Sequence, residues 1–186
     1  MSSNFTKYND EELVEYLKGN QKDASAAFRV LYDRYSSTVH AYCVKVLGYS
    51  DDAEDIFQET FIKFYKNVTN QTTKFNIKGY LLTIARNLSL NAKRNKKQTV
   101  SEEYLEFLYE ENQKYEQKEL LDLVNRAIDL LDEEYKEAYI LKEYNGLEYS
   151  EIAELTGITI SNAKSRVFRA KKKIRDILQP YLKELT

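Results

Sequence analysis

The chain has 186 residues, enough for one large helical domain or two small ones joined by a linker. Charged residues make up 31% and hydrophobic residues 42%, a balance that excludes a disordered chain and a membrane-embedded one. The net charge of −2 argues against an ordinary nucleic-acid binder, until the distribution of charge along the chain is considered. No apolar run approaches the roughly 18 residues that cross a bilayer, and the N-terminal residues lack the order of a signal peptide. We therefore expect a cytoplasmic protein without membrane insertion.

Four helices are predicted in the first half of the chain. The first is capped by Asp10 and stops at Gly19, and the second covers residues 23–47, where apolar residues recur at three- and four-residue steps. A third begins at Ser50, and Asn76 caps a fourth after a polar loop over 69–76. The inward residues of the third and fourth helices are predicted to be Ile56, Phe57, Thr60, Phe61, Phe64, Val68, Leu81, Ile84, Ala85 and Leu88. Together the four helices form a first domain over residues 1–97.

The second half of the chain begins with an acidic segment. Residues 98–117 are rich in glutamate and show no clean apolar period, so we predict a linker there. Residues 118–186 predict four more helices: one ending near Leu131, one from Asp132 to Asn145, a short one from Ser150 to Gly157, and a last one from Ile160 to just before Pro180. The fold class is therefore all-α, with two small helical domains joined by a linker. The C-terminal domain is predicted to be a four-helix, winged-helix-like helix-turn-helix domain.

The last two predicted helices have the spacing of a helix-turn-helix. Ala153 is small where the second helix crosses, and Gly157 permits the turn. Ala163, Val167 and Ala170 recur at steps of four and three, so that face of the last helix is predicted to be buried. The residues predicted to face outward are Lys164, Ser165, Phe168 and Arg169.

The last helix is also strongly basic, with seven Lys and Arg residues between 162 and 175 and no acid before Asp176. Lys and Arg side chains donate to guanine, Ser takes either role, and Phe contacts the thymine methyl. Further cations meet phosphates and add affinity without sequence information. A merely solvated cationic helix is the alternative, and the direction of Arg166 is left open. The predicted duplex-contacting residues are Ser161, Asn162, Lys164, Ser165, Arg166, Phe168, Arg169 and Lys172.

A second basic segment, residues 86–97, has five cations and no acid. Cations near an aromatic ring and an amide fit single-stranded or distorted DNA, whose bases stack and expose their hydrogen-bonding edges. Tyr80 at helical spacing is equally compatible with a place in the core. The residues predicted to contact this DNA are Tyr80, Arg86, Asn87, Lys93 and Arg94.

The third predicted helix has an acidic face. Asp55, Gln58 and Glu59 lie at i, i+3 and i+4, opposite the phenylalanine stripe. This face is either simply solvated or a surface that docks a protein. His40 and Cys43 stand alone and lack the partners of a metal site or a catalytic triad, so we assign both to packing. We expect no catalytic residue, no metal and no cofactor.

In this order, the segments LYDRY, DDAEDIFQETFIKFYKN, GYLLTIARNLSLNAKR, an acidic linker and YSEIAELTGITISNAKSRVFRAKKKI resemble the extracytoplasmic-function sigma factors of the sigma-70 family. The resemblance implies core RNA polymerase and promoter DNA as partners, and an anti-sigma factor as a regulator. It implies that Asp55, Gln58 and Glu59 bind the clamp of the largest polymerase subunit, and that the first domain melts the minus-ten element. It also implies that the second domain reads the minus-thirty-five element and packs on the flap of the second-largest subunit.

Three positions depart from the family's pattern. Tyr80 stands where tryptophan is usual, Asn91 where aspartate is common, and Asp132 where proline is common. Three other functions are possible. A free-standing helix-turn-helix regulator would leave the acidic face unexplained, and a hydrolase would lack a nucleophile or metal set. The third is a helical interaction protein that does not bind nucleic acid.

Overall fold

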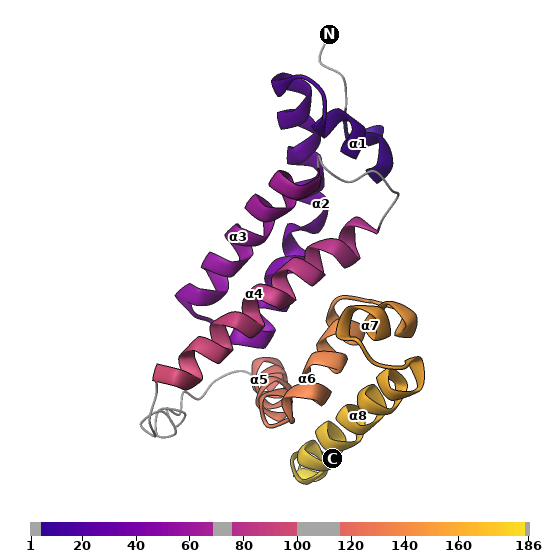
Figure 1. The fold of residues 1–186 in the computed structure, drawn as a ribbon. Coiled ribbons are helices and arrows are strands. Elements are labelled where there is room, and N and C mark those ends of the chain that lie inside the picture. The colour runs from indigo at the N-terminus through magenta and orange to yellow at the C-terminus, as the bar shows by residue number, and fades with distance from the viewer. Residues whose placement is uncertain (1–4, 69–75, 100–115, 185–186) are drawn as a thin grey trace. The chain divides into compact units, whose positions relative to one another are not determined.

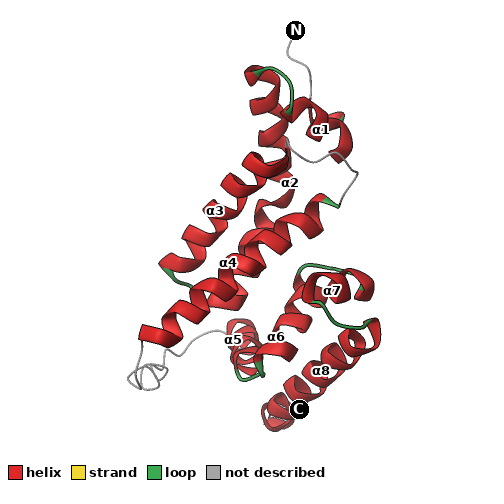
Figure 2. Ribbon diagram, in the orientation of Figure 1, coloured by secondary structure: helices red, strands yellow, loops and turns green. Residues whose placement is uncertain are grey.

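The computed structural model describes residues 5–68, 76–99 and 116–184, and within them it contains helices and turns but no strand (Figure 2). The chain divides into two compact units, Met1–Asn95 and Lys96–Thr186, which are described separately. Most of the predicted linker, residues 100–115, lies outside the described residues. No helix among the described residues is long and apolar enough to cross a membrane.

Unit 1 is built from long helices that lie alongside one another (Figure 1). After a short 3₁₀ turn, η1 (Phe5–Lys7), come α1 (Asp10–Leu17), α2 (Gln21–Leu47), α3 (Asp51–Val68) and α4 (Ile77–Thr99). α2 packs against both α1 and α3. The predicted inward residues of α3 are all buried, and so are Leu81, Ile84 and Ala85 of α4. The apolar period therefore predicted the faces of α3 and α4 correctly.

The predicted cap of α1 is wrong by one residue. Asn9 is the N-cap: its Oδ1 accepts a hydrogen bond from the Glu12 amide at 2.9 Å, and the Glu12 carboxylate accepts one from the Asn9 amide at 2.8 Å. Asp10 instead binds α2, where Arg34 donates to it at 2.8 Å and the Tyr35 hydroxyl also donates. Burial and this hydrogen bond raise the pKa of the Tyr35 hydroxyl. The carboxylate of Asp10 therefore serves a contact with α2, and Asn9 caps the helix.

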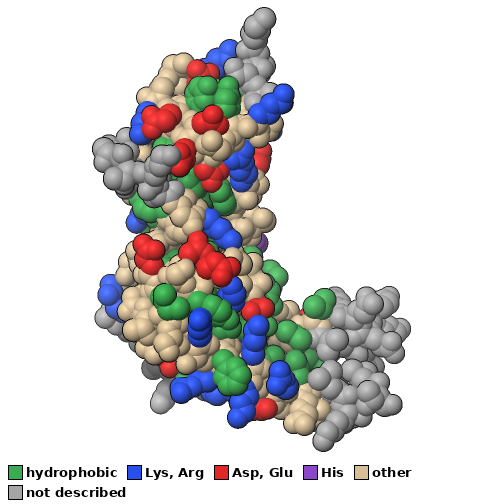
Figure 3. Space-filling model, turned by 90° about the vertical axis from the view of Figure 1, so that its right-hand side faces the viewer, with side chains coloured by type: hydrophobic (Ala, Val, Ile, Leu, Met, Phe, Trp, Pro, Cys, Tyr) green, Lys and Arg blue, Asp and Glu red, His purple; other side chains and the backbone are tan. Residues whose placement is uncertain are grey.

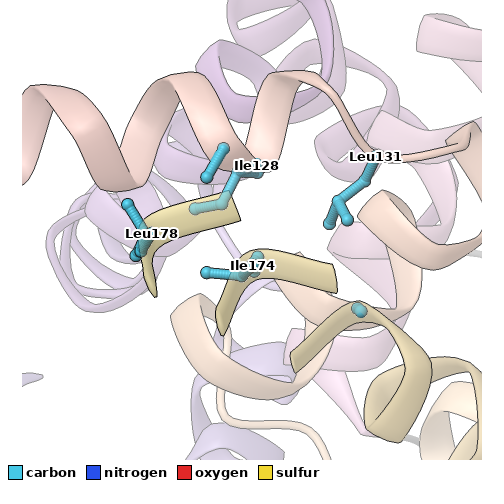
Figure 4. Packing of buried hydrophobic residues seen from close by; sticks show 6 residues of the cluster. Ile128, Leu131, Ile174 and Leu178 are labelled. Atoms are coloured by element: carbon cyan, nitrogen blue, oxygen red, sulfur yellow. The ribbon is translucent and has the colours of Figure 1, made fainter. Parts of the chain in front are cut away.

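Unit 2 contains α5 (Glu116–Asp129), α6 (Glu133–Tyr139), a π-helical turn η2 (Ile140–Tyr144), α7 (Tyr149–Thr156) and α8 (Ile160–Glu184). α8 packs against α5, α6 and α7. Figure 4 shows Ile128 and Leu131 pointing toward Ile174 and Leu178 of α8. This core joins α5 and α8, and Tyr135 and Tyr139 of α6 pack against it.

Two predicted boundaries in unit 2 are wrong, at the start of α7 and at the end of α8. The helical run after Asp132 ends at Asn145 as predicted, but its last residues form the π turn η2, which the apolar period did not indicate. Glu148, not Ser150, caps α7, through a capping box with Glu151. α8 continues through Pro180 to Glu184. Pro180 removes one N–H near an exposed helix end, and buried Leu178 keeps that turn on the core.

We expect the exchange of Gly157 for alanine to destabilise the turn between α7 and α8. Gly157 has φ of +73°, and no heavy atom lies within 4 Å of an added Cβ, so the cost is backbone strain of about 1 to 2 kcal/mol. The midpoint of urea unfolding measures it. Gly79→Ala is the control, because Gly79 lies in a helix and its added Cβ would be 3.5 Å from the nearest atom, an ordinary contact. This exchange should leave the stability unchanged or raise it. Equal midpoints for the two variants would contradict the assignment.

Candidate functional site

The turn between α7 and α8 is fixed by backbone geometry, as predicted. Gly157 is in the left-handed conformation, and the Ile158 amide donates to the Ala153 carbonyl at 3.0 Å. Thr159 Oγ1 accepts from the Asn162 amide at 3.1 Å and so caps the start of α8. Ala153 is buried where α7 meets α8. α7 and α8 thus form a helix-turn-helix.

The buried row of α8 determines which of its side chains face solvent. Ala163, Val167 and Ala170 are buried, with Ile174 one turn further along. The opposite face exposes Ser161, Asn162, Lys164, Ser165, Phe168, Arg169 and Lys172, all of them predicted site residues. Phe168 is 69% exposed, a high value for a phenylalanine. On the face seen in Figure 3, basic side chains surround exposed hydrophobic ones in the lower half.

The cations that flank this face bind side chains of α6 and its neighbours. Arg166 Nη2 lies 2.6 Å from Glu134 Oε2, and Lys173 Nζ lies 2.5 Å from Asp132 Oδ2. On the other side Lys171 Nζ lies 2.8 Å from Glu143, and that hydrogen bond raises the pKa of the lysine. We call Asp132, Glu134 and Glu143 the flanking carboxylates.

Arg169 makes a contact of a different kind. Its Nη1 donates to the Tyr135 hydroxyl at 3.1 Å, and this hydrogen bond raises the pKa of the guanidinium. The bond to a tyrosine hydroxyl positions the Arg169 guanidinium, which pairs with no carboxylate at salt-bridge distance among the described residues. Sequence reasoning missed this contact and the flanking carboxylates, because the partners lie 28 to 41 positions apart along the chain.

The predicted site residues of α4 lie in two adjacent rows. Tyr80, Asn87 and Arg94 are spaced seven apart, while Arg86 and Lys93 form the second row. Asn87 and Arg94 are exposed, and Arg86 and Lys93 are half-buried. Tyr80 is half-buried, with its ring centroid 6.2 Å from that of Phe64.

Between these two rows lies a residue that the sequence did not single out. Leu90 is 44% exposed and follows Arg86 and Asn87 by about one turn. An exposed leucine among cations and an amide gives this face of α4 an apolar centre.

The acidic face of α3 is exposed, as predicted. Asp55, Gln58 and Glu59 lie opposite the buried phenylalanine row, and Glu59 pairs with Lys63 one turn along at 3.1 Å. An exposed i, i+4 pair of this kind contributes little to stability. Stability of α3 therefore does not account for the cluster of acidic and amide side chains.

An apolar groove of about 470 Å³ runs beside the acidic face, between α2 and α3. Its aromatic floor is continuous: the ring of Tyr32 lies 4.8 Å from that of Phe61, and the ring of Phe28 lies 5.3 Å from that of Tyr65. Gln58 also lines the groove, together with Ile62, which is 52% exposed. Sequence reasoning missed the groove, although apolar residues at 62 and 65 broaden the stripe of α3 beyond what its core needs.

The two residues assigned to packing occupy different environments. Cys43 is fully buried, and burial raises the pKa of its thiol to about 12. His40 is partly exposed, lies 3.4 Å from Glu54, and meets the ring of Phe57 edge-on. In the part of the chain that the structure describes, no group of His, Cys, Asp and Glu residues could hold a metal ion.

Comparison with known proteins matches both units to family models. The model of sigma-70 region 2 matches residues 31–99, and that of sigma-70 region 4 matches residues 121–174. The ferric citrate uptake sigma factor FecI of Escherichia coli is 30% identical over 79% of this chain and 88% of its own. The ECF RNA polymerase sigma factor SigW of Bacillus subtilis is 27% identical over 88% of this chain and 95% of its own.

A solved structure has the same fold. It is the sigma factor RpoE in complex with the anti-sigma factor NepR from Bartonella quintana, which is 25% identical with a TM-score of 0.65. The likeness covers 82% of this chain and 96% of that one.

The assignment of faces on α8 predicts different effects at two adjacent residues. Val167→Ala should cost about 1 to 3 kcal/mol of stability, because it removes buried methyl groups. Phe168→Ala, which removes an exposed ring, should stay within about 0.5 kcal/mol of wild type. Urea unfolding of both variants decides the matter, and a larger loss at 168 than at 167 would mean that α8 is rotated.

Proposed function

Since the chain belongs to the extracytoplasmic-function group of the sigma-70 family, and so directs transcription initiation by RNA polymerase without being an enzyme, we propose that its helices present three separate binding surfaces. One surface binds polymerase, and two bind promoter DNA. The observation that carries this proposal is the sorting of side chains: acidic and apolar on the outside of α3, basic on α4 and α8.

The polymerase surface is the acidic face of α3 together with the groove beside it. Asp55 and Glu59 offer charge to basic residues, while the aromatic floor offers apolar area that lies partly open to solvent. A helix with both basic and apolar residues fits this combination. We assign it to the clamp of the largest polymerase subunit, as in the family.

The outward face of α8 reads the duplex of the minus-thirty-five element. Lys164, Ser165 and Phe168 provide a donor, a hydroxyl and an apolar contact close to the start of the helix, where a recognition helix enters the major groove. Arg169 lies on the same face, where its hydrogen bond to Tyr135 holds its guanidinium in position. Lys172, one turn further along, is placed to meet phosphate.

The two rows of α4, in which Asn87 and Arg94 are the exposed members, capture the unpaired strand of the minus-ten element. Asn87 supplies an amide for a base edge, and Arg86, Lys93 and Arg94 supply charge for the backbone. Tyr80, half-buried against Phe64, offers only part of its ring for stacking. Asn87→Ala should lower the permanganate reactivity of promoter thymines, which reports unpaired bases. Unchanged reactivity would contradict this role.

Two further partners are proposed on family grounds. The first is the flap of the second-largest polymerase subunit, bound by unit 2, which site-specific cross-linking in holoenzyme would test. The second is an anti-sigma protein, since the related RpoE was solved with the anti-sigma factor NepR. Uniform activity of this chain in cells under all growth conditions would argue against such an inhibitor.

Charge reversal on α3 tests the polymerase surface. We expect Asp55→Lys with Glu59→Lys to abolish measurable assembly with core polymerase, because two attractive contacts become repulsive. Co-purification with core enzyme and run-off transcription measure the effect. The control is Glu11→Lys with Glu15→Lys on α1, which changes net charge equally and should assemble normally. Equal loss in the two double variants would reduce the effect to net charge alone.

Two lysines of α8 should differ in effect on promoter recognition. Lys164→Ala should relax discrimination at one base pair and cost about 1 to 3 kcal/mol on the preferred sequence. Lys172→Ala should weaken binding uniformly and lower the salt slope by about 1. Run-off transcription by reconstituted holoenzyme on promoters with systematic upstream substitutions measures both. Identical sequence profiles for the two variants would contradict the division between base and phosphate contacts.

A further inference from the structure

The cations of α8 between residues 164 and 173 form two sets that differ in what lies beside them. Lys164, Arg169 and Lys172 are on the outward face, while Arg166, Lys171 and Lys173 each meet a flanking carboxylate. The number of basic residues in this segment therefore overstates the charge available to a phosphate backbone.

The pair of Arg166 with Glu134 is the most enclosed of the three. The Arg166 side chain is 26% exposed and that of Glu134 49%, with 2.6 Å between Nη2 and Oε2. Glu134 lies in the first turn of α6, where the helix dipole favours a negative charge. α6 packs directly on α8, so the backbones of both partners are held in place. Arg166 thus faces a fixed carboxylate.

Such a pair does little for folding but much for binding to nucleic acid. Partly exposed ion pairs contribute little to stability. Affinity for arbitrary duplex depends chiefly on how many phosphates are neutralised and how many counterions are released. An arginine already bonded to a carboxylate releases no counterion, and the carboxylate repels a phosphate that approaches it.

We propose that Glu134 is a specificity-determining residue: by holding Arg166 in an ion pair, it lowers the affinity of α8 for duplex of arbitrary sequence. Discrimination is thereby left to the outward face at Lys164, Ser165 and Phe168. This proposal rests on the duplex-binding role of α8. Arg166, which the sequence predicted to contact DNA, is instead the ion-pair partner of Glu134.

A double-mutant cycle on the full chain tests the proposal, with a short duplex of random sequence as the probe and fluorescence anisotropy as the readout. Glu134→Gln should tighten binding about fivefold at about 0.15 M salt and steepen the salt slope by about 0.9, the effect of one added phosphate contact. Arg166→Gln should not tighten binding, and it should weaken binding less than Lys172→Gln does, because Arg166 makes no phosphate contact and only the uncompensated Glu134 carboxylate acts from a distance. The double variant removes both charges and should bind within about twofold of the wild type, without the gain seen for Glu134→Gln.

Two further variants provide the controls. Glu154→Gln on α7 removes the same charge from the same unit without touching the pair, and should have less than half the effect of Glu134→Gln. Lys172→Gln should weaken binding about fivefold. Urea midpoints verify that each variant is folded.

Two results would overturn the proposal while leaving duplex binding by α8 intact. One is an effect of Glu134→Gln no larger than that of Glu154→Gln. The other is a loss with Arg166→Gln as large as that with Lys172→Gln. If Lys172→Gln itself leaves binding unchanged, or no variant binds the duplex at low salt, then the duplex-binding role of α8 fails and the inference fails with it.

Discussion

The orientation of α8 depends on one buried row, and the recognition surface depends on that orientation. Ala163 and Ala170 are fully buried and small, so neighbouring helices approach α8 closely at those points, while Val167 and Ile174 fill the space between. Each outward side chain stands at a fixed angle from this row, since an α-helix turns 100° per residue. Lys164, Ser165 and Phe168 face solvent because the buried row on the opposite side of the helix packs against the other helices of unit 2. The left-handed turn at Gly157 then sets the angle at which α7 meets α8. Packing in unit 2 and the choice of residues presented to DNA are thus two consequences of one pattern.

In unit 1, too, a buried row determines which side chains of a helix face outward. The buried row of α3 leaves an outer surface that is partly acidic and partly apolar, and the apolar part needs α2 as its second wall. α2 is in turn tied to the N-terminal residues by Arg34, which donates to Asp10 and to the carbonyls of Thr6 and Tyr8 at 2.8, 3.2 and 2.6 Å. Phe28 and Tyr32 lie six and two residues before Arg34 on the same helix. The groove is therefore a product of tertiary contacts, while the acidic face is a property of α3 alone.

This difference explains what the sequence could and could not predict. Helical faces follow from local period, so the buried rows of α3, α4 and α8 and the turn at Gly157 were predicted correctly. Features decided by distant residues were not. The cap of α1 moved to Asn9 because Asp10 has partners on α2, and the π turn η2 has no signature in the apolar pattern. The groove and the bond from Arg166 to Glu134 each join separate helices, and a single sequence does not state which helices meet.

Net charge is a poor guide to this molecule because its charges are locally compensated. The chain carries a net charge of −2, yet Lys and Arg dominate the exposed face of α8. Even there, three cations bind flanking carboxylates, so the charge facing a duplex is smaller than the sequence count. A surface with few free cations binds duplex weakly by itself. Weak contacts suffice for a polymerase subunit, because linking them through one enzyme makes each later contact intramolecular and raises its effective concentration. The modest charge that α8 presents therefore favours binding to duplex as part of the holoenzyme over binding by the free chain.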